Sequence, residues 1–106
     1  MAKYLLKASY TTDGVKGVMK DGGSGRRAAV EETVRGLGGS LESFYFAFGD
    51  TDAYVVVDLP DNVTATAISL VVNAAGGAQV TTIPLITPEE ADEATKKSVE
   101  YSPPGG

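Results

Sequence analysis

The chain has 106 residues and a net charge of −5, with 42% hydrophobic and 22% charged residues, and it contains neither cysteine nor histidine. Such a size and composition are typical of one globular domain and not of a disordered chain. The two missing residue types exclude a disulfide framework, a thiolate nucleophile, a serine–histidine–aspartate triad and histidine ligation of zinc or haem. What remains is carboxylate, tyrosine, lysine and arginine chemistry, or the binding of a hard cation by oxygen ligands. The sequence identifies no cofactor and no specific metal ligand.

The acidic balance and the scattered basic residues predict no nucleic-acid partner. The longest apolar runs are far shorter than the ~20 residues needed to cross a bilayer, which predicts no membrane partner. The N-terminal stretch MAKYLLKASY lacks the apolar core of a signal peptide. A cytoplasmic protein is the expectation.

Residues 3–10 alternate as a strand, with Tyr4, Leu6, Ala8 and Tyr10 on the more apolar side. Residues 11–19 predict a short helix capped by Thr12 or Asp13, and the stretch KDGGSG predicts its end. A second helix is expected over 24–37. It should bury Val30, Val34 and Leu37.

Two strands are expected next, over 41–48 and 53–59. The first places its three phenylalanines on one face, which predicts a core or dimer contact: Phe44, Phe46 and Phe48. The second has a uniformly apolar face, which should lie under the helices: Ala53, Val55, Val57 and Leu59.

The stretch PDN opens another helix, with Asp61 or Asn62 as cap, and Gly76-Gly77 closes it. Its spacing predicts a buried face of Val63, Ala67, Leu70, Val71 and Ala74. Residues 79–86 predict an edge strand, because Pro84 cannot donate to a central ladder. TPEE then starts a last helix with Thr87 as N-cap and Glu90 closing a capping box.

The order β-α-β-β-α-β with an extra C-terminal helix predicts an α+β fold, a ferredoxin-like sandwich with an antiparallel sheet. We expect a single domain over 1–100 and a flexible or docking tail over 101–106. Both main helices should cover one face of the sheet. The helix-free face should carry Tyr54 and Val56 with either Tyr45 or the phenylalanines, which predicts a homodimer packed sheet to sheet.

Three stretches carry a resemblance to a known family: KYLLKASYTTDG, GGSLESFYFAFGDTDAYVVVDLPDN and TTIPLITPEE. With the order of elements, they resemble the GYD-domain family of small bacterial proteins from Tyr4 to about Val99. The resemblance implies a ferredoxin-like fold of the dimeric α/β-barrel group, and it implies no particular reaction. The family's Gly-x-Tyr-Asp pattern falls on Gly49-Asp50-Thr51-Asp52, so Thr51 stands where the family has tyrosine.

The stretch Gly49 to Asp52 has two interpretations. Asp50 and Asp52 project carboxylates that orient a water, accept a proton or hold a hard cation at the end of the sheet. Alternatively, all four residues only form a hairpin turn, since glycine, aspartate and threonine are ordinary turn residues. The alternation of the flanking strands places Asp52 on the same helix-free face as Tyr54 and Val56. This favours Asp52 as the site residue and leaves Asp50 as a turn residue.

Other candidate residues are aromatic or basic. Tyr10, Tyr45 and Tyr54 line an aromatic ligand pocket or, more simply, pack at an interface. Arg26 and Arg27 follow a glycine-rich stretch at a helix start, where they hold an anion or form a solvated face. The candidate pocket residues are therefore Tyr10, Tyr45, Gly49, Thr51, Asp52 and Tyr54, with Asp50, Arg26 and Arg27 as weaker candidates.

The leading functional hypothesis is a homodimeric module that binds a small apolar or aromatic molecule in a pocket between two sheets, near Gly49 to Asp52. A second hypothesis is a cofactor-independent enzyme of oxygenase-like or isomerase-like type, using Asp52, Tyr10 or Tyr54 for proton transfer. A third is a structural protein whose edge strands build larger assemblies.

Overall fold

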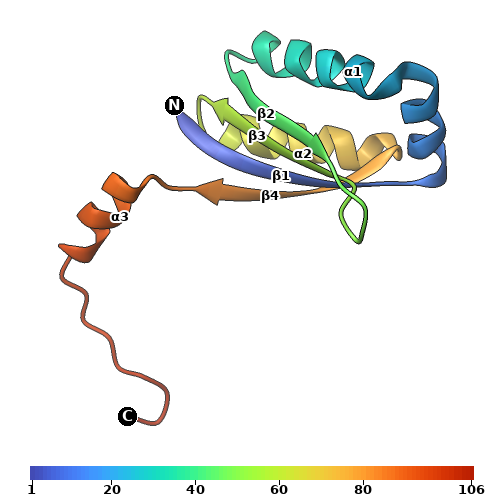
Figure 1. Cartoon of the computed structure of the whole chain (residues 1–106). Coiled ribbons are helices and arrows are strands. Elements are labelled where there is room, and N and C mark those ends of the chain that lie inside the picture. Colours follow the sequence, from blue (N-terminus) through green and yellow to red (C-terminus); the bar gives the residue numbers. More distant parts are fainter.

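The computed structural model describes all 106 residues, and its centre is a four-stranded antiparallel sheet. The strand order is β2-β3-β1-β4, and helices α1 and α2 both cover one face (Figure 1). This arrangement confirms the predicted ferredoxin-like α+β fold, including the edge position of the strand that holds Pro84. The strands are β1 (Ala2–Tyr10), β2 (Ser40–Phe46), β3 (Ala53–Leu59) and β4 (Ala78–Leu85).

Helix α1 (Thr12–Gly36) consists of two straight segments joined at one residue. Gly22 has φ 76° and ψ 163°, outside the helical region, and the chain changes direction sharply there (Figure 1). The predicted break between two helices is therefore a kink. Thr11 is the N-cap, because its hydroxyl accepts the N–H of Gly14, so the predicted caps Thr12 and Asp13 lie one and two residues too late.

Helix α2 (Asn62–Ala75) has the predicted ends, with Asp61 as N-cap and Gly76 in the left-handed conformation as C-cap. Its predicted buried face is wrong. Ala65 and Ile68 are buried, whereas the predicted face is exposed: Val63, Leu70 and Val71 are 79%, 66% and 68% exposed. The helix carries apolar residues on nearly all sides, so its spacing fits more than one face.

Strand β2 contains a bulge between Leu41 and Ser43, and this bulge reverses the alternation of its side chains. As a result Leu41 and Phe44 both pack against the core, although the alternation predicts opposite faces. Phe46 is 42% exposed and Phe48, beyond the end of the strand, is fully exposed. Phe48 is therefore not part of the core of one chain, and for this residue the prediction of a dimer contact stays a prediction.

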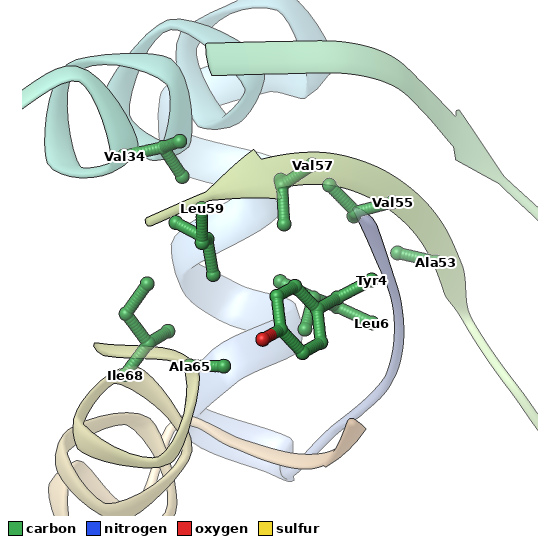
Figure 2. Packing of buried hydrophobic residues seen from close by; sticks show 9 residues of the cluster. All are labelled: Tyr4, Leu6, Val34, Ala53, Val55, Val57, Leu59, Ala65 and Ile68. Carbon is green, nitrogen blue, oxygen red and sulfur yellow. The ribbon is translucent and has the colours of Figure 1, made fainter. Parts of the chain in front are cut away.

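The core lies between the sheet and the two helices (Figure 2). Val34 of α1 and Ile68 of α2 lie on either side of Leu59, at the end of β3 (Figure 2). The predicted apolar face of β3 is confirmed, since Ala53, Val55, Val57 and Leu59 are at most 4% exposed. The nine buried residues are Tyr4, Leu6, Val34, Ala53, Val55, Val57, Leu59, Ala65 and Ile68.

Helix α3 (Pro88–Thr95) and the residues after it form an arm that leaves the domain (Figure 1). The predicted capping box is present, with Thr87 accepting the N–H of Glu90 and Glu90 accepting the N–H of Thr87, yet no residue of α3 is buried. The radius of gyration is 16.7 Å, against roughly 13 Å for a compact chain of this length. None of the three helices is both long and apolar enough to cross a bilayer.

Candidate functional site

An apolar cavity of about 200 Å³ lies between the two covering helices and the sheet. Helix α1 packs mainly on β2 and α2 mainly on β4, and the helices make few contacts with each other. The gap between them opens above β1, which contributes Leu6 and Ala8 to the floor. Of the 15 lining residues, 13 are hydrophobic, so the interior suits an apolar molecule.

A second, more polar cavity of about 350 Å³ adjoins the first. The two share Tyr10, Arg26 and Thr33 in their walls, with Val72 and Ala78. The polar cavity is bounded by the first segment of α1 and the end of α2. These elements approach closely, since a Cβ atom on Gly14 would lie 1.8 Å from the carbonyl oxygen of Gly77, so only glycine fits there.

Three aromatic rings cluster beside the kink of α1, and two of them, Tyr10 and Phe44, line the apolar cavity. The ring centroids of Tyr10 and Phe46 are 6.5 Å apart, and those of Phe44 and Phe46 are 5.1 Å apart. A Cβ atom on Gly23, directly after the kink, would lie 3.1 Å from the Phe46 ring, so the backbone of the second segment rests against this ring. The absence of a side chain at Gly23 therefore allows α1 to lie directly against the Phe46 ring.

The stretch Gly49 to Asp52 is a loop tied to the end of β1. The Asp52 carboxylate accepts the backbone N–H of Tyr10 at 2.8 Å, and the backbone N–H of Asp52 donates to the carbonyl of Ala8 at 2.8 Å. The hydroxyl of Ser9 donates to the carbonyl of Asp50 at 2.9 Å. Asp52 thus extends the ladder between β3 and β1 through its side chain and holds Tyr10 in place.

The three tyrosines predicted to share a pocket do not meet within one chain. Tyr45 and Tyr54 lie opposite each other on β2 and β3, on the helix-free face, where they are 70% and 39% exposed. Tyr10 lies on the covered face and lines both cavities. Gly49 and Asp50 are exposed and Thr51 is half-buried, and none of the three lines either cavity.

Of the two candidate arginines, the structure brings only Arg26 to the cavities, where it lines both. Arg27 is exposed and lines neither. No group of three or more acidic side chains comes together in a way that would hold a metal ion. The apolar cavity therefore offers apolar contact and three polar side chains, those of Arg26, Tyr10 and Thr33.

The helix-free face carries one ion-pair network. The Lys3 ammonium lies 2.8 Å from a Glu42 carboxylate oxygen and 3.0 Å from one of Asp58. The hydrogen bonds to Glu42 and then to Asp58 raise the pKa of Lys3 above its ordinary value. This network joins β1, β2 and β3, so it holds three charged side chains together at one end of the helix-free face, called the open face below.

Several cavity residues were not predicted from the sequence as site residues. They come from the helices and from β4 and resemble ordinary core positions: Ala29, Val30, Thr33, Val72 and Val80. Their role depends on the distance between α1 and α2, for which the sequence contains no local signal. Tyr10 and the Gly-rich stretch beside Arg26 are the sequence features that pointed to this region.

Comparison with known proteins gives one family. A model of the GYD domain matches residues 4–95, from β1 to the end of α3. No curated protein and no solved structure matches the chain. Because the match spans the sheet and all three helices described above, the chain belongs to the GYD domain family.

Proposed function

We propose that this protein is a homodimeric binding module for a small apolar molecule, and that the cavity under α1 and α2 is its pocket. The observation that carries this proposal is the cavity itself, which is lined almost entirely by hydrophobic side chains. Ligand pockets in proteins are usually concave and mostly apolar, with a few polar groups that orient the ligand. Arg26 and Tyr10 are such groups here.

This position differs from the pocket between two sheets that the sequence suggests. A pocket between sheets would need a partner chain, whereas the cavity described here is formed by residues of one chain. The two helices leave room for a ligand because they pack on different strands. A molecule bound there would fill space that the side chains leave open.

Two features support the homodimer. The helix-free face exposes Tyr45 and Tyr54 and holds the half-buried Val56, and such a face is stabilised by a second apolar surface. The arm that includes α3 has no buried residue of its own and carries the exposed Val99 and Tyr101. A second copy would provide cover for both, with the two-fold symmetry that is commonest among oligomers.

An enzyme is less well supported than a binding module. The residues suggested for proton transfer do not converge on the cavity, because Asp52 is bonded to the backbone of Tyr10 and Tyr54 lies on the opposite face of the sheet. Tyr10 alone remains at the cavity wall. A binding function needs no second acid or base and fits these residues better.

A cavity-filling substitution tests the proposed pocket. Ala29 lines the cavity and Ala28, the preceding residue of α1, does not, and both are exposed. We expect the wild type and Ala28→Phe to bind the neutral apolar dye N-phenyl-1-naphthylamine with a saturable rise in fluorescence. Ala29→Phe should weaken the affinity at least about tenfold, because its ring occupies the pocket.

Circular dichroism of both variants shows whether the fold is kept. Equal dye binding by folded Ala29→Phe and Ala28→Phe would show that the dye binds elsewhere. No saturable binding by the wild type would overturn the proposed function.

A further inference from the structure

We infer that the ligand of this cavity is an amphipathic monocarboxylate, with its apolar body between the helices and the sheet and its carboxylate on Arg26. This inference rests on the proposed binding function and names the ligand class for the same pocket. It follows from three properties of Arg26: its place at the junction of the two cavities, its weak pairing within the chain, and the absence of another cation in the wall.

Arg26 lies where the apolar cavity meets the polar one. It follows the kink of α1 by four residues and lines both cavities. Its side chain is 34% exposed, so it is partly covered and partly accessible to solvent. It is the only charged residue among the 15 that line the apolar cavity. A ligand whose body fills this cavity would therefore meet one positive charge at its polar end.

The guanidinium of Arg26 has only a weak partner within the chain. Its one ion pair is to Asp21, across the kink, at 4.0 Å, and it makes no hydrogen bond. By comparison, Lys3 lies 2.8 Å from Glu42, and Arg35 lies 3.4 Å from Glu31. Because a guanidinium has five N–H donors in a planar fork, Arg26 keeps donors free for a bidentate carboxylate.

The surroundings favour a single negative charge on the ligand. Asp21 lines the polar cavity beside Arg26, and the chain as a whole carries a net charge of −5. A phosphate or dicarboxylate would bring a second negative charge close to Asp21 with no second cation to balance it. One carboxylate on an apolar body matches one guanidinium at the end of an apolar cavity.

Octanoate and 1-octanol have carbon chains of equal length, so comparing them measures the contribution of the carboxylate apart from that of the apolar chain. We expect octanoate to displace N-phenyl-1-naphthylamine from the wild type at a concentration at least about tenfold lower than 1-octanol. Arg26→Gln should remove this preference and leave the 1-octanol value within about twofold. Arg27→Gln is the matched control, since Arg27 is exposed and lines neither cavity, and it should keep the preference.

The outcomes distinguish this inference from the proposed function. If the two molecules displace the dye equally from the wild type, the pocket binds apolar molecules but does not select a carboxylate, and the inference is wrong. A preference that survives in Arg26→Gln, or disappears in Arg27→Gln, would mean that Arg26 does not hold the carboxylate. If neither molecule displaces a dye whose binding Ala29→Phe weakens, the pocket stands and the inference is wrong.

Discussion

The two faces of the sheet are built from the same strands and have different roles. On β3, Val57 faces the helices and is fully buried, whereas its neighbour Val56 faces the open side and is half-buried. The covered face contains the core and the cavity, so stability and the proposed binding both depend on it. The open face mixes tyrosines with the Lys3 network, and one chain leaves it uncovered. An alternating strand can thus serve the fold on one side and a partner on the other.

The largest effect on stability should come from replacing a valine by alanine on the covered face of β3, compared with the same substitution on the helix-free face. Val57→Ala removes two methylene equivalents from the core and leaves a cavity, so it should lower the free energy of unfolding by about 2 to 3 kcal/mol. Val56→Ala should cost less than about 1 kcal/mol in the monomer, because its site is partly solvated. Urea unfolding followed by circular dichroism at low protein concentration measures both.

Repeating the unfolding of Val56→Ala and Val57→Ala at several protein concentrations tests whether the helix-free face is an interface. If the open face is covered in a dimer, the cost of Val56→Ala should grow with concentration, while that of Val57→Ala should stay constant. Equal costs for the two variants at low concentration would contradict the asymmetry of the two faces.

A charge on each exposed surface tests which one carries the homodimer. Val56→Asp places a carboxylate in the open face, and Val63→Asp places one on the outer face of α2, where Val63 is 79% exposed. We expect Val56→Asp to raise the dimer dissociation constant at least about tenfold, because an unpaired charge is costly to bury at an interface. Val63→Asp should leave the constant unchanged.

Sedimentation velocity across a range of concentrations measures both variants. Dissociation by Val63→Asp alone would move the interface to the outer face of α2. A wild type that stays monomeric at every concentration would overturn the homodimer.

The parts of this fold that depend on local patterns were predictable from the sequence. The bounds of β3, the Asp61 and Thr87 caps and the Gly76 terminus match the prediction, because each follows from a few neighbouring residues. The buried face of α2 was not predictable, since its apolar residues surround the helix. The bulge in β2 also has no clear signal, yet it moves Leu41 to the covered face.

The candidate site was predictable only in fragments. Tyr10 and Arg26 were named from the sequence, and they line the same cavities. Tyr45, Tyr54 and the loop at Asp52 lie elsewhere, because a strand's alternation assigns a residue to a face without saying which face holds a cavity. The cavity itself arises from the separation of two helices that are distant in sequence, and no single segment encodes that separation.

The smallest effects should be pH-dependent, with one group on each side of the sheet. Asp61 caps α2 on the covered side, and its pKa lies below the ordinary 3.8 because its carboxylate accepts the N–H of Thr64 at 2.8 Å. Lys3 lies on the open side, and its pKa is raised above the ordinary 10.5 by Glu42 and then Asp58. The two groups should therefore limit stability at opposite ends of the pH scale.

The signs follow from linkage. The Asp61 carboxylate stabilises the fold fully above pH 3.8, and this contribution is lost as the pH falls through the lower pKa of the folded state. The Lys3 ammonium stabilises the fold fully below pH 10.5, and its contribution is lost as the pH rises through the higher pKa of the folded state. Asp61→Asn keeps a capping side chain that does not titrate, so it should weaken only the acid-side loss. Lys3→Met should weaken the alkaline loss, because it removes the group that loses its charge there. Urea midpoints are compared between wild type and each variant, so that the contributions of all other groups, which both proteins share, cancel. If Lys3→Met left the alkaline limb unchanged, the ion pairs of Lys3 would contribute nothing to the stability of the fold.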